Sequence, residues 1–363
     1  MHFRSAVRLW CFCGSVVVFS LLAHSQAGQL GAIHVDSQDS KEGVRMSLKP
    51  STLPPPSPEA VKLLNELVAA NGVDMQPTTP WHVELTYDEF DEDGDNVHSG
   101  TVEEFYVDAK KYKKIIKTDG FAQTEVADGT DLYRDGDQSW PPQSTLQALK
   151  EVLSPLYAAN SRSDSVPDKL DWTVGKTALS CVVLRNGRVI SENGLPKFCY
   201  EPGTTILRYT RGAGWNETVY NDLFQFEQRY VARDTEVTHA GKPFLRIHLL
   251  KVESVQQLGG SMFLPPAGSR PLSGVITVPS AVLMSEYLVN RPSLPELPRG
   301  VRGKVDVRLL VDKDGHVVRA EAIDGPKELW KPVEKYFMKL QFRSFLILDR
   351  AVEVESTTAI NIQ

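Results

Sequence analysis

The chain has 363 residues, with 40 Lys and Arg against 46 Asp and Glu and a formal net charge of −6. This acidic balance argues against a nucleic-acid partner, because binding to a phosphate backbone requires a basic surface. The length is enough for about two globular domains. The composition therefore predicts a multi-domain protein that does not bind nucleic acid.

Residues 1–27 have the layout of a cleaved signal peptide. Arg4 and Arg8 precede an uncharged run over residues 9–23, and Ser25-Gln26-Ala27 places small residues at both positions that a signal peptidase recognises. The apolar run is shorter than the roughly 20 residues that a membrane-spanning helix needs. We therefore expect cleavage near Ala27 and a periplasmic or secreted protein. Retention of the segment as an inner-membrane anchor is the less favoured alternative.

The segment 28–56 is predicted to be a Pro-rich tether with few apolar residues to bury. A helix is expected directly after it, because Ser57 is a suitable N-cap, Pro58 suits the first helical position and Gly72 suits the exit. The expected apolar stripe of this helix consists of Val61, Leu64 and Val68.

Alternating apolar residues then predict a long series of strands. Residues 81–87 alternate apolar and polar side chains, as in a strand with one buried face. Further strands are expected at 102–107, 112–117, 121–126, 173–184, 197–200, 205–210, 223–228, 230–237 and 244–252. One helix, over residues 144–153, interrupts them. The predicted fold class is α+β, with an antiparallel, half-barrel-like β domain over residues 57–258.

This order of a leading helix, a long antiparallel sheet and one mid-chain helix resembles the LolA/LppX-like half-barrel of bacterial lipoprotein carriers, over residues 57–255. The resemblance implies an apolar concave face that holds acyl chains, so lipid is an expected ligand. The alternative is that the apolar strand faces simply form the core.

Two cysteines, Cys181 and Cys199, remain after the leader is removed. In an exported protein an even pair favours a disulfide, here across neighbouring strands with a turn at residues 186–194 between them. The alternative is a pair of buried thiols. A metal site is not expected at these cysteines, because zinc needs four ligands and no histidine pair lies nearby at ligand spacing. No cofactor is predicted.

Glycines and prolines concentrate in residues 259–274, which we predict to be a linker between two domains. The second domain is expected to span residues 275–363, and its first part, 275–289, is expected to add a strand or a lead-in segment.

Residues 301–363 have the pattern strand, strand, helix, strand. Alternating apolar residues start at Gly303, and Asp314-Gly315 is a hairpin signal, because glycine accepts a positive φ. A helix with Pro332 in its first turn is expected next. Its apolar stripe consists of Leu329, Val333, Phe337 and Leu340.

This order resembles the C-terminal domain of TonB-type proteins, and the matching elements are Gly303-x-Val305, Val311-Asp312-x-x-Gly315-x-Val317, Gly325 and Leu329. The resemblance implies docking to an envelope protein such as an outer-membrane receptor, whose segment adds as a β-strand to the final strand of the domain. The residues expected at this partner-binding edge strand are Val352, Val354, Thr357, Ile360 and Ile362.

Catalytic signatures in the sequence are weak. The chain has no Gly-x-Ser-x-Gly, His-Glu-x-x-His or phosphate-loop pattern. We therefore expect a non-enzymatic, exported bacterial envelope protein with a TonB-like interaction domain and a role in envelope transport. The alternatives are a periplasmic lipid or lipoprotein carrier and a hydrolase whose polar groups assemble only in three dimensions.

Overall fold

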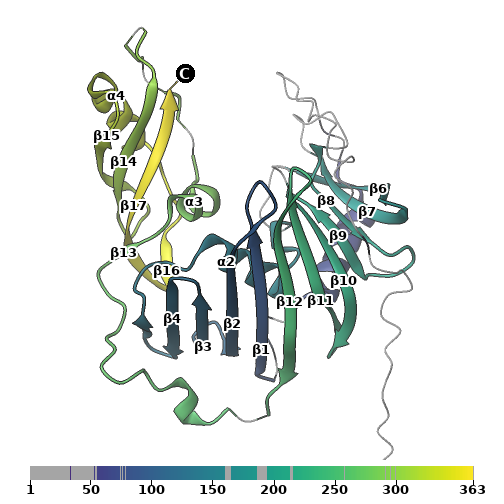
Figure 1. The fold of residues 1–363 in the computed structure, drawn as a ribbon. Helices are drawn as coiled ribbons and strands as arrows, with labels where there is room; N and C mark the ends of the chain where they lie inside the picture. Colours follow the sequence, from purple (N-terminus) through teal and green to yellow (C-terminus); the bar gives the residue numbers. More distant parts are fainter. Residues whose placement is uncertain are drawn as a thin grey trace, which may run out of the picture.

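The computed structural model describes residues 33, 53, 55–73, 75, 77, 79–159, 165–185, 194–212, 216–256, 258–290, 292–294, 296–298 and 300–362. The predicted signal peptide, most of the predicted tether and the turn at 186–193 lie outside the described residues. Within the described part, the strands form one large sheet and one small sheet (Figure 1).

The large sheet contains β1 (Trp81–Phe90), β2 (Asn96–Asp108), β3 (Lys111–Thr118), β4 (Phe121–Asp128), β5 (Leu132–Gly136), β6 (Val166–Val174), β7 (Thr177–Arg185), β8 (Lys197–Tyr200), β9 (Leu207–Arg211), β10 (Asn216–Phe226), β11 (Arg229–His239) and β12 (Lys242–Ser254). Their order is β5-β4-β3-β2-β1-β12-β11-β10-β9-β8-β7-β6, and neighbouring strands pair antiparallel. The sheet is therefore two meanders, β1–β5 and β6–β12, joined where β1 pairs with β12. It stays open, with β5 and β6 at its two edges.

Two helices, α1 (Pro58–Ala70) and α2 (Gln143–Leu153), cover one face of this sheet. Leu64 and Leu67 of α1 pack with buried residues of β7 to β11, and Leu149 and Val152 of α2 pack with those of β1, β2, β11 and β12. Both helices belong to the same face, because Tyr220 packs in the α1 cluster and also hydrogen-bonds to α2. We call this the helix-covered face and the opposite one the outer face.

The start of α1 forms as predicted. The Ser57 hydroxyl accepts a hydrogen bond from the Ala60 N–H at 3.3 Å, and Pro58 is the first residue of the helix. The predicted stripe is only partly right, since Val61 is exposed while Ala60, Leu64 and Leu67 are buried. The side of α1 that packs on the sheet is therefore rotated about the helix axis relative to the side that the periodicity indicated.

Two strand predictions in the middle of the chain are corrected. The run 173–184 is not one strand, because a turn at Gly175-Lys176, with Gly175 at φ 58°, divides it between β6 and β7. β5 and most of β6 were not predicted. β5 is short and lacks a clear alternation, whereas in β6 the alternation of Leu170, Trp172 and Val174 with polar residues was missed.

The small sheet contains β13 (Val275–Thr277), β14 (Gly303–Val311), β15 (Val317–Asp324), β16 (Phe345–Ile347) and β17 (Arg350–Ile362). Its order is β13-β17-β14-β15, with β16 paired to β17. The helix α4 (Lys327–Phe337) lies between β15 and β16 in the chain, and α3 (Ser280–Val282) continues into a π-helical turn, Leu283–Tyr287. The predicted order of strand, strand, helix and strand is confirmed.

Helix α4 buries the predicted residues Leu329, Val333 and Phe337. The expected position of Pro332 is wrong, because α4 begins at Lys327 and Pro332 therefore lies in its second turn. A proline there removes the backbone hydrogen bond to the residue four before it. Burial of the three apolar side chains on the sheet offsets this loss.

The small sheet stands on the β3–β5 end of the large sheet (Figure 1). Lys110 pairs with Asp349 at 2.6 Å, Arg350 pairs with Asp131 at 2.7 Å, and the rings of Trp140 and Phe345 meet edge to face. The Gly/Pro segment 259–274 packs on the large sheet, where the Leu272 N–H donates to the Leu132 carbonyl at 2.6 Å.

None of the helices in the described part of the chain has the length and apolar character needed to span a bilayer.

Candidate functional site

A groove of about 850 Å³ opens beside the first turns of α2. The tips of the β1–β2 and β11–β12 hairpins form its other walls. Four apolar residues line it, namely Phe90, Ala240, Pro243 and Phe244. Ala240 and Gly241 both adopt positive φ, which makes the β11–β12 turn tight and holds Pro243 and Phe244 next to the opening.

The rim of the groove is polar and cross-linked. The Lys242 ammonium donates to the Glu92 carbonyl at 2.7 Å, which joins the tips of the two hairpins. The His239 Nδ1 lies 2.6 Å from the Asn216 Oδ1, which joins β11 to β10. The groove thus presents an apolar wall with a polar edge, an arrangement suited to an amphipathic ligand.

A second, smaller pocket of about 150 Å³ adjoins the groove, and the two share Gln147 and Asn216 among their lining residues. Glu151 of α2 lines this inner pocket and is almost fully buried. Its carboxylate accepts hydrogen bonds from the Tyr220 hydroxyl, at 2.5 Å, and from the Gln147 amide. Burial raises the pKa of Glu151 to about 7, against these hydrogen bonds, which lower it. The inner pocket therefore contains a carboxyl group that changes charge near neutral pH.

The rest of the helix-covered face is filled. α1 and α2 pack directly on the apolar residues of the sheet, so those residues form the core beneath the helices. The apolar strand faces were expected either to hold acyl chains or to form the core. Under the two helices they form the core. The groove beside α2 lies at the end of this packed region, where α2 meets the tips of two hairpins.

The outer part of β17 forms an open strand edge. The Glu355 carbonyl accepts a hydrogen bond from the Val278 N–H at 2.9 Å, on the side of β13. Backbone groups alternate sides along a strand, so those of Thr357, Ala359 and Asn361 point to the same side as those of Glu355. The pairing of β13 ends at Glu355, and among the described residues no strand pairs with β17 beyond it on that side.

The predicted edge residues divide into two groups. Val354 and Ile362 are buried, and Val352 and Ile360 are partly buried, so these four anchor β17 to the small core. Thr357 is exposed, and it is the predicted residue whose backbone points to the open edge. Any contact of this edge with a partner would therefore use mainly backbone groups.

The predicted disulfide is confirmed. Cys181 of β7 and Cys199 of β8 are cross-strand partners with Cα atoms 4.0 Å apart, and their sulfur atoms are bonded. Both are buried on the outer face with Val174, Tyr209 and Val219. The bridge fixes the register of β7 against β8 on the face opposite α1.

Glu151 and Tyr220 were missed by the sequence analysis. Gln147 and Glu151 are four residues apart, so they share one side of α2, and the flanking Leu149 and Val152 are buried. A polar pair within a buried helix is a usable signal for an internal polar site. Its partner on β10 is not visible in the sequence, because Glu151 and Tyr220 are separated by 69 positions and nothing local links them.

No protein-family model matches the sequence, and no curated protein matches it. Several solved structures are similar in fold, among them the following three. A domain described as an outer membrane lipoprotein-sorting protein, from Vibrio parahaemolyticus, shares 10% identity and a TM-score of 0.35, covering 56% of this chain and 96% of that one. A LolA superfamily protein from Nitrosomonas europaea shares 10% identity and a TM-score of 0.36, covering 56% and 97%. A DUF1329 family protein from Desulfovibrio piger shares 11% identity and a TM-score of 0.32, covering 58% and 98%.

The first two of these structures carry a lipoprotein-sorting and a LolA description. These TM-scores mark a distant likeness in fold. The resemblance of the C-terminal segment to TonB-type domains stays a prediction.

Proposed function

We propose that this chain is a non-enzymatic envelope protein that carries an amphipathic ligand with an acyl chain in the groove beside α2. The observation that carries the proposal is the combination of an apolar wall, formed by Phe90, Pro243 and Phe244, with a polar, cross-linked rim. The volume of the groove, about 850 Å³, lies within the roughly 300–1,000 Å³ range of small-molecule sites.

The chemistry of the lining favours binding over catalysis. The lining residues that are described include no serine, threonine or cysteine that could act as a nucleophile. The polar groups are amides, carboxylates, one imidazole and one ammonium, and the imidazole of His239 is already bonded to Asn216. Such groups can orient a head group at the rim while the acyl chain lies against the apolar wall.

Export is part of the proposal. The leader pattern supports it, and so does the Cys181–Cys199 bond, because disulfides persist in oxidising compartments outside the bacterial cytoplasm.

Binding of a fluorescent long-chain fatty acid tests the carrier function. Phe244→Asp places a charge in the apolar wall and should weaken binding at least tenfold. Leu250→Asp is the matched control, because Leu250 lies on the same strand, is 56% exposed and does not line the groove. Equal affinity of the folded Phe244→Asp variant and the wild-type chain would exclude the groove as the site.

A second function is favoured by the open edge of β17. We propose that residues 275–363 bind an extended segment of an envelope protein, such as an outer-membrane receptor, by adding it as a strand beside Thr357, Ala359 and Asn361. The direction of these backbone groups supports the proposal, since unpaired N–H and C=O groups along an edge can pair with another chain.

A further inference from the structure

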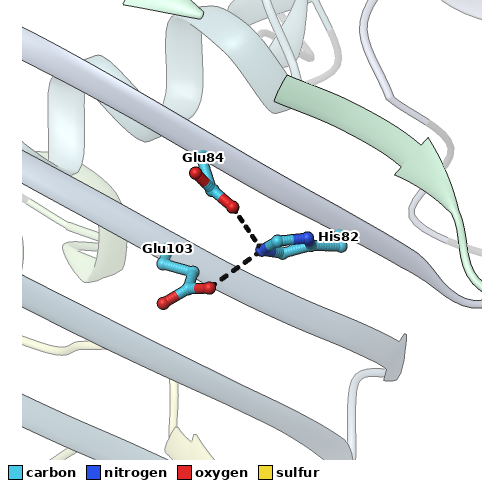
Figure 2. Close-up of side chains that lie close together, drawn as sticks. All are labelled: His82, Glu84 and Glu103. Carbon is cyan, nitrogen blue, oxygen red and sulfur yellow. Dashed lines mark hydrogen bonds and ion pairs between the residues drawn. The ribbon is translucent and has the colours of Figure 1, made fainter. Parts of the chain in front are cut away.

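A histidine and three glutamates from three adjacent strands meet on the outer face of the large sheet. His82 and Glu84 come from β1, Glu103 from β2 and Glu253 from β12. The His82 Nε2 lies 3.0 Å from Glu103 Oε1 and 3.3 Å from Glu84 Oε1. Figure 2 shows both carboxylates directed at this one nitrogen. The cluster lies at the seam of the sheet, where β1 of the first meander pairs with β12 of the second, and on the face opposite the groove.

The register of the strands places two like charges opposite each other. Glu84 and Glu103 are direct cross-strand partners in the β1–β2 pair. Like charges in this position destabilise a sheet unless a cation lies between them. A bulge contributes the third carboxylate. The β1–β12 register shifts between Glu84 and Leu85, so Leu250 is left without a partner and the strand changes phase, which turns Lys251 and Glu253 outward beside His82.

The imidazole is held in one orientation. The ring of His82 stacks on Phe105 with centroids 4.0 Å apart and an interplanar angle of 4°, and the side chain is only 5% exposed. Its Nδ1 lies 3.3 Å from Glu253 Oε1. When Nδ1 carries the proton and donates it to Glu253, the Nε2 lone pair faces the two other carboxylates. This is the arrangement in which a carboxylate orients a histidine for metal binding.

The cluster has an excess of negative charge in either state of the imidazole. The cations within 4.0 Å of its carboxylates, among the described residues, are Lys251 and His82 itself. Lys251 lies closest to Glu253, with 2.7 Å between its Nζ and Glu253 Oε1, and 4.0 Å from Glu84 Oε1. Glu84 and Glu103 thus converge on Nε2, and the one lysine within 4.0 Å of the cluster's carboxylates, among the described residues, lies closer to Glu253 than to either of them.

We propose that His82, Glu84 and Glu103 bind a divalent transition-metal ion such as Zn²⁺, with Glu253 orienting the histidine. Zinc with bonds of about 2.1 Å in a tetrahedral site has neighbouring ligand atoms about 3.4 Å apart. The two distances from Nε2 to the carboxylates, 3.0 and 3.3 Å, are close to this spacing. One imidazole and two carboxylates suit Zn²⁺ better than Ca²⁺ or Mg²⁺, which prefer oxygen ligands alone.

The ion would have a fourth position open to solvent. The side chains of Glu84 and Glu103 are 38% and 36% exposed, so water can reach the point on which they converge. Because the ligands belong to β1 and β2 and the orienting Glu253 to β12, the ion ties together three strands at the seam of the sheet. Binding should therefore stabilise the folded chain as well as neutralise the cluster.

Isothermal titration of Zn²⁺ into the full exported chain, stripped with a chelator and free of any histidine tag, tests the proposal. We expect one zinc ion at this site, a higher melting temperature with zinc, and no comparable binding of Ca²⁺ or Mg²⁺. Glu103→Gln and Glu84→Gln should each weaken zinc binding at least tenfold, and Glu253→Gln should weaken it about 10- to 100-fold. These exposed glutamines leave the sheet intact, which circular dichroism checks.

A second group of possible ligands, Asp312, Asp314 and His316 in the β14–β15 hairpin, provides the control. Asp314→Asn should leave the zinc ion bound at His82 and the melting shift unchanged. Zinc affinity that stays the same in folded Glu84→Gln and Glu103→Gln, or that is lost in Asp314→Asn alone, would overturn the proposal.

Discussion

The hydroxyl of Tyr220 donates a hydrogen bond of 2.5 Å to Glu151, and this bond joins β10 to α2 inside the molecule. The hydrogen bond has opposite effects on the two pKa values, because it lowers that of Glu151 and raises that of Tyr220. Burial is the main cause for both, and it raises the pKa of Tyr220 well above its usual value and that of Glu151 to about 7. Tyr220 therefore stays a neutral donor while Glu151 titrates in the inner pocket.

This titration predicts a pH-dependent stability. The unfolded Glu151 carboxyl ionises near pH 4.5 and the folded one near 7, so the folded state holds its proton more tightly. This tighter proton binding adds about 3 kcal/mol to the free energy of unfolding. The added stability is fully present below about pH 4.5 and is lost as the pH rises through about 7. Urea unfolding of wild type and Glu151→Gln from pH 4.5 to 8 measures it. The variant should lack this part of the pH slope and gain stability relative to wild type as the pH rises. Parallel curves for the two proteins would contradict the assignment.

The disulfide gives a second prediction. Cys181 and Cys199 are 18 residues apart in the sequence. A bridge that closes a loop of this length lowers the entropy of the unfolded chain and so stabilises the folded state by about 3 kcal/mol. The double variant Cys181→Ala with Cys199→Ala should lower the melting temperature of the chain by several degrees. A reducing agent should have the same effect on wild type and none on the double variant. A wild type whose melting is insensitive to reduction under conditions that cleave the bond would show that the bridge does not stabilise the fold.

Pro332 gives a third prediction, because it occupies an interior position of α4. Replacement by alanine restores a backbone N–H that can donate to the carbonyl of Glu328 and removes the clash of the ring with that turn. A proline in a helix interior costs about 3 kcal/mol, so Pro332→Ala should increase the free energy of unfolding by up to this amount. The exposed neighbour Lys331 supplies the control, since Lys331→Ala should change stability by less than about 0.5 kcal/mol. A destabilised Pro332→Ala would mean that the helix starts later than residue 327.

The C-terminal part of the fold was predictable because its signals are local. The alternation after Gly303, the turn at Asp314-Gly315 and the stripe of Leu329, Val333 and Phe337 each specify one element within a few residues. The same is true of the Ser57 cap. The position of Pro332 was misjudged because a local rule for proline was applied where tertiary burial of the helix has the larger effect.

The polar sites could not be predicted, because they depend on strand register and on topology. Glu84 and Glu103 become neighbours only once the β1–β2 register is known, and Glu253 joins them only because β12 pairs with β1 across 171 residues from His82. The bulge at Leu250 adds a change of phase that no alternation pattern shows. Periodicity indicates which face a side chain occupies, but not which strand lies beside it.

The open edge of β17 gives the last prediction, and amide hydrogen exchange measures it directly. Thr357, Ala359 and Asn361 should exchange quickly, because their N–H groups point away from β14, whereas Thr358 and Ile360 should be protected by pairing with β14. A partner segment that adds at this edge should slow the first set alone.

Proline substitutions at adjacent positions give the matched mutational test of the same edge. Thr357→Pro removes an N–H that points outward, so the domain should still fold while capture of partner proteins from an envelope extract weakens. Thr358→Pro removes an N–H that pairs with β14 and should destabilise the small sheet. If both variants fold poorly, both sides of the strand are paired in solution. Should Thr357→Pro fold and capture partners as wild type does, strand addition at this position is excluded, because a partner strand could not pair there without the missing donor.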